Sequence, residues 1–153
     1  MCHGTDEKGD RRMISTRGRY ALRVMIDLAE HRNGSYIPMK DVARRQEISL
    51  KYIERIMPLL TKEKFVEGQH GKGGGYKLCR EPEDYSVGDI LRAAGEDLSP
   101  VSCLSCNAPV CSRAAECRTL PMWKKFCEIT NSYFDGITLA DLMNTDSCND
   151  YVI

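Results

Sequence analysis

A pattern in residues 49–79 limits the folds open to this chain: an amphipathic helix that begins after Ser49 and is followed at once by a glycine-rich hairpin. A serine here can cap the helix, because its hydroxyl accepts a hydrogen bond from a backbone N–H of the first turn. At about 100° per residue, one helix face collects four apolar side chains: Ile53, Ile56, Met57 and Leu60. The opposite face carries Lys51, Glu54 and Arg55. We therefore expect one face in a core and the other on the surface.

The hairpin and two earlier helices complete the pattern. The sequence predicts short strands at Phe65–Glu67 and Tyr76–Cys79, joined by the turn-prone segment Gly68–Gly75. Apolar spacing predicts two helices upstream, over Gly18–Arg32 and Pro38–Gln46. This order of elements is typical of a winged helix-turn-helix, in which the last helix enters the major groove of DNA.

The rest of the chain is predicted to be helical apart from one irregular stretch. Periodicity predicts helices over Ser86–Ala94 and Thr138–Met143, and a long amphipathic helix over Leu120–Phe134. Residues 100–117 have no regular periodicity. The expected fold class is thus mainly α with a small β-hairpin wing.

The formal net charge is zero, but the charges are unevenly distributed. Residues 1–80 hold 17 Lys and Arg against 10 Asp and Glu, a net charge of +7, whereas residues 81–153 hold 5 against 12, a net charge of −7. A basic first half suits contact with nucleic acid. No apolar run approaches the roughly 20 residues that span a bilayer, and the N-terminal residues are polar. We therefore expect a cytoplasmic protein without membrane contact.

The exposed face of the capped helix is the candidate surface for reading bases. Lys51 and Arg55 can donate hydrogen bonds to guanine, and Glu54 can accept one from cytosine. Ser49 and Tyr52 are candidates for phosphate contacts.

The hairpin turn supplies a second candidate contact through His70 and Lys72. Its glycines leave the backbone able to approach a narrow minor groove, whose negative potential attracts cations. A nucleotide-binding loop is not expected, because the glycines lack the strand and helix context of that motif.

Four of the eight cysteines form a dense group with the spacing C-x2-C-x4-C-x5-C, within 15 residues: Cys103, Cys106, Cys111 and Cys117. Structural disulfides are rare in the cytosol, and closely spaced thiolates suit a soft metal centre, either an iron-sulfur cluster or zinc. We expect one compact centre. Cys79 and Cys127 are predicted to be small buried side chains rather than ligands, and Cys2 and Cys148 are also left out of the site.

These motifs together resemble the Rrf2 family of bacterial transcriptional regulators. The resemblance spans about residues 13–143 and rests on four stretches: STRGRYA at 15–21, ISLKYIE at 48–54, GKGGGY at 71–76 and Cys111-x5-Cys117-x5-Trp123. It implies a homodimer in which the helix Leu120–Phe134 crosses its partner, bound to a palindromic operator in double-stranded DNA. It also places Lys51, Glu54 and Arg55 where the family reads bases, and His70 where some members have a minor-groove arginine.

The iron-sulfur branch of that family implies a ligand set of three loop cysteines and one further group. Cys111 and Cys117 match the last two cysteines, and Cys103 is our choice for the first, with Cys106 as its alternative or as a fourth ligand. One group of members has a histidine three residues after its last cysteine, where this chain has Leu120. A 2Fe-2S cluster is expected rather than 4Fe-4S, and zinc remains the alternative.

The expected organisation follows from these assignments. Residues 1–12 and 146–153 are expected to be tails, 13–80 a winged helix-turn-helix domain, 81–99 a connecting helix, 100–118 a cysteine loop and 119–145 a dimerisation helix region.

The expected function is a DNA-binding transcriptional regulator that senses iron-sulfur status, redox state or nitric oxide. A small iron-sulfur electron carrier would explain the cysteines alone, and a third hypothesis is a cluster-free regulator with structural or zinc-bound cysteines. An enzyme with a small-molecule substrate is not expected, because no catalytic constellation is recognisable around the three histidines, His3, His31 and His70.

Overall fold

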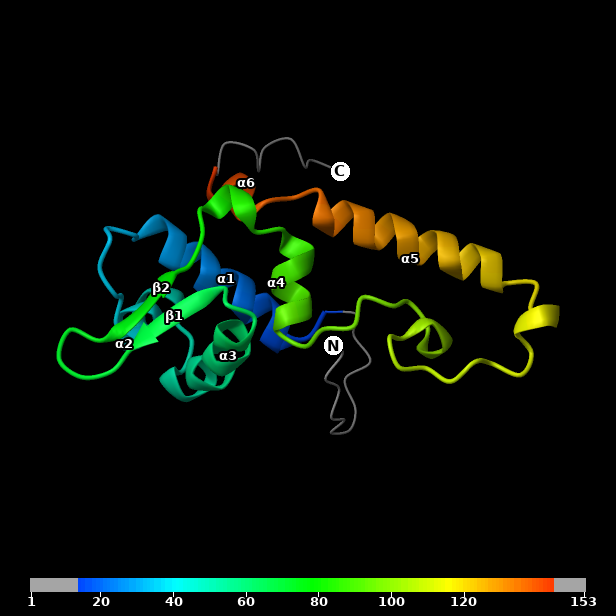
Figure 1. Ribbon diagram of the computed structural model, residues 1–153, viewed down its shortest axis with the longest axis horizontal. Helices are drawn as coiled ribbons and strands as arrows, with labels where there is room; N and C mark the ends of the chain where they lie inside the picture. Colours follow the sequence, from blue (N-terminus) through cyan, green and yellow to red (C-terminus); the bar gives the residue numbers. More distant parts are fainter. Residues whose placement is uncertain (1–13, 145–153) are drawn as a thin grey trace.

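Three helices and a two-stranded hairpin come first along the chain, and a long helix comes near its end (Figure 1). This computed structural model describes residues 14–144; the predicted tails 1–12 and 146–153 lie outside the described residues. The helices are α1 (Thr16–Glu30), α2 (Met39–Gln46), α3 (Leu50–Lys62), α4 (Val87–Ala93), α5 (Leu120–Asp135) and α6 (Leu139–Met143). The strands are β1 (Val66–Gln69) and β2 (Gly75–Leu78), and three short 3-10 turns are η1 (Pro82–Asp84), η2 (Ser102–Leu104) and η3 (Ala114–Glu116).

The predicted fold class is confirmed, with small shifts at the ends of elements. Ser49 caps α3 as expected, and Ser86, predicted as the first helical residue, is the N-cap of α4; each hydroxyl accepts a hydrogen bond from a backbone N–H of the first turn. α1 begins two residues earlier than predicted, because Ser15 supplies its N-cap. The segment before Pro38 makes a single bridge, between Ile37 and Tyr76, rather than a strand of its own.

The main core lies among α1, α2, α3, the base of the hairpin and α6. It holds the four predicted apolar side chains of α3 and, from α6, the fully buried Leu139. A smaller apolar cluster is formed by Val87 and Leu91 of α4 together with Leu98, which follows the helix. The chain between α4 and α5 runs out to the far end of α5, which projects from this body as a rod (Figure 1). Within the described chain, only the C-terminal part of α5 meets the body, where Arg92 of α4 donates to Asp135 Oδ1 at 2.8 Å.

A buried tyrosine fastens the base of the hairpin. The Tyr85 hydroxyl donates to the Phe65 carbonyl oxygen at 2.7 Å and accepts from the backbone N–H groups of Cys79 at 3.1 Å and Arg80 at 2.9 Å. Its backbone carbonyl oxygen accepts from Leu139 N at 2.9 Å. One residue, through its side chain and its backbone, thus ties the base of the hairpin to the segments that carry α4 and α6.

A single buried carboxylate joins α1 to α2. The Asp27 side chain has no exposed surface and lies 2.5 Å from Arg45 Nη2, measured at Oδ1. Oδ2 accepts from Arg45 Nε at 3.0 Å and from Gln46 Nε2 at 3.0 Å. Burial by itself raises the pKa of Asp27, but the hydrogen bonds from Arg45 and Gln46 and the charges of Arg45 and His31 outweigh it, so the pKa is lowered. Both partners lie in the last turn of α2, just before the left-handed residue Glu47 that leads to α3.

Replacing Arg45 with methionine should strongly destabilise the protein, because it leaves the Asp27 carboxylate buried with little compensation. We expect a loss of about 3 kcal/mol in the free energy of unfolding, measured by urea denaturation at pH 7. A lowered folded-state pKa gives stability that is present above the ordinary value of 3.8 and is lost as the pH falls through the folded value. This acid dependence should therefore shrink in the variant.

Arg44→Met is the matched control, since Arg44 is largely exposed and pairs only with Asp41 at 3.5 Å. It should change the unfolding free energy by less than about 0.5 kcal/mol. Equal losses in the two variants would contradict a structural role for the buried pair.

Candidate nucleic-acid interface and cysteine loop

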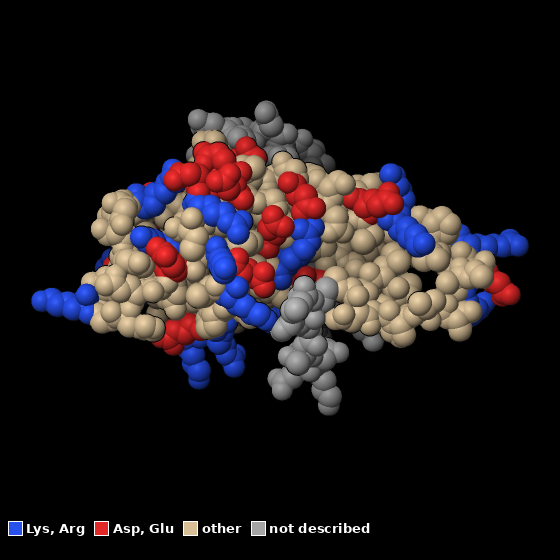
Figure 2. Space-filling model, viewed as in Figure 1, with Lys and Arg blue, Asp and Glu red and all other residues tan. Residues whose placement is uncertain are grey.

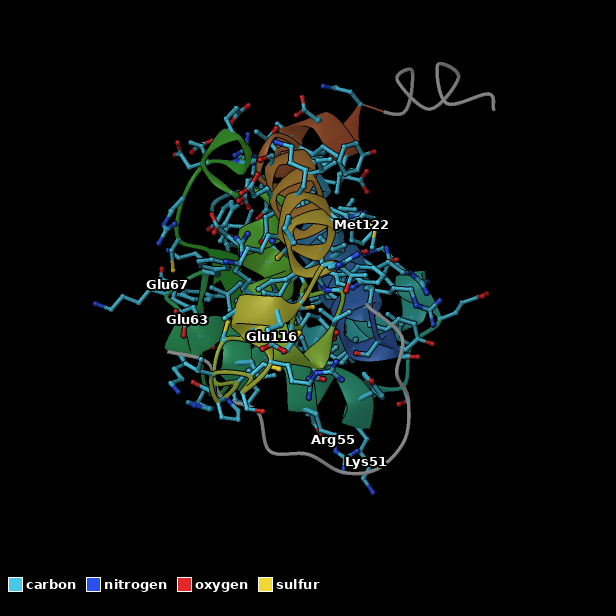
Figure 3. The ribbon with its side chains drawn as sticks, turned by 90° about the vertical axis from the view of Figure 1, so that its right-hand side faces the viewer. Lys51, Arg55, Glu63, Glu67, Glu116 and Met122 are labelled. Carbon is cyan, nitrogen blue, oxygen red and sulfur yellow. The ribbon has the colours of Figure 1, made fainter. Side chains whose placement is uncertain are left out.

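The outer face of α3 carries the three residues predicted to read bases. Lys51, Glu54 and Arg55 are exposed, whereas Ile53 and Ile56 beside them are fully buried. Figure 3 shows Lys51 and Arg55 pointing away from the body on the same side. Among residues 14–144, none of the three forms an ion pair. Their polar groups are therefore available to an external partner.

The two predicted phosphate contacts occupy different environments. Ser49 is exposed, but its hydroxyl already accepts from Tyr52 N at 3.2 Å. The Tyr52 ring is half-buried and packs edge-on against Tyr20 of α1, with 5.2 Å between ring centroids. Arg23 lies over the Tyr20 ring at 5.5 Å and donates to Gln46 Oε1 at 3.2 Å. Through its ring contact with Tyr20, Tyr52 also holds the start of α3 against α1.

The hairpin forms the wing that the glycines predicted. β1 and β2 pair antiparallel, with Val66 opposite Leu78 and Gln69 opposite Gly75. A Cβ on Gly75 would lie 2.1 Å from the Ile37 carbonyl oxygen, so this position accepts only glycine. His70 and Lys72 are exposed in the turn, which projects from the body at the end opposite α5 (Figure 1).

Charge is arranged to favour one orientation on a polyanion. In Figure 2, basic side chains project from the wing end, from the side that carries α3 and from the far end of α5. Acidic side chains gather on the opposite edge, over η1, where Glu81, Glu83 and Asp84 are exposed. A negatively charged partner is therefore attracted to the side of α3 and the wing and repelled from the other.

The four clustered cysteines lie on the loop between α4 and α5, here called the cysteine loop (residues 97–119). Cys103 is in η2 and Cys117 directly follows η3. Cys103, Cys106 and Cys111 are exposed and Cys117 is half-buried. Within residues 14–144, no three His, Cys, Asp or Glu side chains meet in a group that could hold a metal ion.

The donor chemistry of the cysteine loop nevertheless fits a soft metal. Its thiols are accessible, and a hydrogen bond with Thr119 Oγ1, at 3.4 Å from Cys117 Sγ, lowers the pKa of Cys117. Thiolates are the preferred ligands of iron-sulfur clusters and of zinc. Holding either group would require the loop to close around it. Leu120, which stands where a histidine ligand was considered, is the first residue of α5.

The prediction for the isolated cysteines was wrong at Cys79. Cys79 lies just past the end of β2 and is exposed, although its backbone N–H still donates to the Phe65 carbonyl oxygen at 3.1 Å. Partial burial and the nearby Glu67 carboxylate raise the pKa of its thiol. Cys127 is half-buried on α5, and Cys2 and Cys148 lie outside the described residues.

α5 presents an apolar stripe that nothing in residues 14–144 covers. The helix has no buried residue, and the exposed fractions along the stripe are 53% for Met122, 43% for Phe126, 56% for Ile129 and 54% for Tyr133. Met122 is seen at the outer part of the helix in Figure 3. Spacings of four, three and four residues match the heptad pattern by which helices pack together.

Comparison with known proteins places the chain in a family. A family model described as Rrf2, "Iron-dependent Transcriptional regulator", matches residues 14–145. The chain is a member of the Rrf2 family. The resemblance predicted from sequence is thereby confirmed, and this Rrf2 protein is a transcriptional regulator and not an enzyme.

Individual relatives agree over most of their length. Protein rrf2 of Nitratidesulfovibrio vulgaris is 37% identical over 134 residues, which cover 88% of this chain and 89% of that protein. The structure of T. potens IscR matches with a TM-score of 0.66 and 32% identity, covering 92% of this chain and 91% of the other. CymR, described as the global cysteine regulator of B. subtilis, matches with a TM-score of 0.67 and 30% identity, covering 85% of this chain and 95% of the other.

These matches confirm the winged-helix fold for this Rrf2 protein. In the part of the chain described, residues 14–144, no helix is long and apolar enough to cross a membrane.

Sequence reasoning missed two buried carboxylates that hold this arrangement in place. Asp27 interrupts the apolar face of α1 between Val24 and Leu28, which was a sign of a buried ion pair. Glu96 has a side chain only 6% exposed, although it stands between Gly95 and the exposed Asp97. No periodicity distinguishes it from a surface residue.

Proposed function

We propose that this Rrf2 regulator binds a palindromic operator as a homodimer, with α3 in the major groove and the wing at the minor groove. The observation that carries the proposal is the face of α3, where Lys51, Glu54 and Arg55 are exposed directly opposite a fully buried face. A capped helix with its first turns exposed is the usual reader of base edges.

Each DNA contact has a proposed role. Lys51 and Arg55 donate to guanine O6 and N7, and Glu54 accepts from cytosine N4. Ser49 and Tyr52 contact phosphate at the start of the helix. Lys72 supplies the cation of the wing, and His70 lies nearby in the same turn. A DNA-binding regulator acts where the DNA is, in the cytoplasm.

The homodimer is proposed from the apolar stripe of α5. Four large side chains more than 40% exposed on one helix are an unusual solvent surface. A second copy of α5 offers the same heptad-spaced stripe, so a two-fold pair would bury both. The pair would also fix the separation of two α3 helices, as a palindromic site requires.

For the cysteine loop, we propose an iron-sulfur cluster, 2Fe-2S rather than 4Fe-4S, held by Cys103, Cys111 and Cys117. Cys106 is the alternative first ligand or a fourth. The support is the accessible thiol set, the family description that names iron, and the likeness to IscR. A bound cluster would supply chemistry sensitive to oxidants and nitric oxide, and the loop would order around it.

Two other functions are distinguishable from this one. A regulator whose loop cysteines bind zinc, or are structural, would have the same DNA contacts without a coloured centre. A small electron carrier would leave the exposed face of α3 and the wing without a role.

The DNA proposal is tested by replacing Arg55 with alanine. Loss of a bidentate contact should weaken binding to the operator by about 1–3 kcal/mol more than binding to unrelated DNA. Fluorescence anisotropy measures both affinities, one with a fragment from upstream of the protein's own gene and the other with unrelated DNA. Lys125→Ala, a basic residue of α5 paired with Glu128, is the control and should change neither affinity. Equal losses on both DNAs would make Arg55 a phosphate contact.

The homodimer is tested by Ile129→Glu. A charge in the middle of the α5 stripe removes apolar burial from both copies, so the dimer dissociation constant should rise at least about a hundredfold in sedimentation equilibrium. Val110→Glu is the matched control, because Val110 is 92% exposed but lies on the cysteine loop. A parent protein that is monomeric at all concentrations, or an Ile129 variant that dimerises normally, would refute the proposal.

The cluster is tested by visible absorption of anaerobically purified protein. Cys111→Ala and Cys117→Ala should each abolish the absorption and alter operator affinity, whereas Cys79→Ala, at another exposed thiol, should do neither. Loss of colour with Cys106→Ala but not Cys103→Ala would reverse our choice of first ligand. A colourless parent that contains zinc would favour the zinc-bound regulator.

A further inference from the structure

A buried carboxylate connects the cysteine loop to the first turn of α1. Glu96 stands one residue after Gly95, between α4 and the loop, and its side chain is only 6% exposed. Its Oε2 accepts from Ser15 N at 3.1 Å, and its Oε1 accepts from Gly18 N at 3.0 Å. The Ser15 hydroxyl also donates to Oε1. The Glu96 side chain therefore adds a second cap to α1 from 81 residues away, since the Ser15 hydroxyl accepts from the same Gly18 N only at 3.5 Å.

The first turn of α1 is shaped around this contact. A Cβ on Gly18 would lie 2.7 Å from Glu96 Cγ and 2.9 Å from its Oε1. Glycine weakens a helix relative to alanine, so its place here is explained by the approach of the carboxylate. Arg17 reinforces the contact, with Nη2 donating to the Gly95 carbonyl oxygen at 3.2 Å and Nε lying 4.0 Å from Glu96 Oε1.

The chain that follows Glu96 is braced as far as the first loop cysteine. Leu98 is buried beneath α4, and Asp97 Oδ1 accepts from Ser99 N at 2.9 Å. The Ser99 hydroxyl donates to the Leu104 carbonyl oxygen at 2.9 Å, which closes a turn around Cys103. A short segment held by its own hydrogen bonds thus connects Cys103 to Glu96.

α1, which Glu96 contacts, connects to the surface proposed to meet DNA. α1 packs against α2, α3 and β2, and its Tyr20 ring holds Tyr52 at the start of α3. A shift of the first turns of α1 would thus change the position of α3.

We propose that Glu96 is a positioning residue that transmits the state of the cysteine loop to the DNA-binding helices. In the conformation described here its carboxylate is seated on α1; when the loop rearranges, the carboxylate withdraws and the first turn of α1 loosens. The inference rests on the proposed function in one respect, that the loop state alters DNA binding. A carboxylate is suited to this task because the exposed N–H groups of a helix N-terminus favour negative charge.

The test is a double-mutant cycle between Glu96 and Ser99 in the full chain, followed by amide hydrogen exchange of Gly18. Glu96→Gln presents an NH2 group to one of the two backbone donors, so exchange at Gly18 should accelerate about fivefold, as for loss of one capping interaction. Ser99→Ala, which breaks the loop brace, should also accelerate exchange at Gly18, although it does not touch α1. In the double variant, Ser99→Ala should add nothing further.

A purely structural cap would behave differently. In that case Ser99→Ala would leave Gly18 exchange unchanged, or its effect would multiply with that of Glu96→Gln, and either result would overturn the proposal. Ser86→Ala is the matched control, because it removes one hydrogen bond at the N-cap of α4 without touching the path from Ser99 to Glu96. It should leave Gly18 exchange as in the parent.

Operator affinity provides an independent second readout. Ser99→Ala should change affinity in the parent background and have no effect in the Glu96→Gln background. If the parent binds no operator, the proposed function fails, but the exchange cycle still decides whether Glu96 couples the loop to α1. If operator binding is normal and the exchange effects are independent, the coupling fails while the proposed function stands.

Discussion

The ion pair between the buried Asp27 and the partly exposed Arg45 fixes the position of α2, and with it that of α3. It joins the last turn of α1 to the last turn of α2, and the left-handed residue Glu47 then directs the chain into α3. When the ion pair and the turn at Glu47 are in place, the apolar face of α3 meets the core and its polar face lies on the surface. The pairing of Tyr20 with Tyr52 secures the same arrangement at the start of α3. Every proposed base contact depends on this placement, because a recognition helix reads DNA only from a rigid support.

The molecule divides its work between that rigid body and a more open arm. The hairpin, α4 and α6 are tied to the body through the Tyr85 hydrogen bonds, whereas α5 has no buried residue and its apolar stripe is uncovered in the described chain. The cysteine loop lies between the two, attached to the body at Glu96 and leading into α5. In the proposed dimer, such a connection would let one loop influence both the spacing of the two subunits and the position of α1 within each subunit.

Local sequence patterns predicted much of this structure, but they did not reveal the pairs of residues that lie far apart in the chain. The Ser49 cap and the period of α3 were confirmed, as was the glycine-rich wing, because each depends on neighbouring residues. Asp27 interrupts an apolar helix face, which hints at a buried charge but not at its partner 18 residues away, and no local pattern marks Glu96, whose partner Ser15 lies 81 residues away. The sequence showed four clustered cysteines, but an irregular loop has no periodicity from which a ligand geometry could be predicted. The individual base and metal contacts stay predictions.

Selection of bound sequences from a random DNA library by the full-length protein tests the central claim most directly. The account predicts recovery of a two-fold symmetric site, with half-sites separated by about 34–36 Å or a multiple of it, one α3 helix in each major groove. Recovery of no enriched sequence, or of a single half-site without symmetry, would contradict an operator-binding dimer built on α3 and α5.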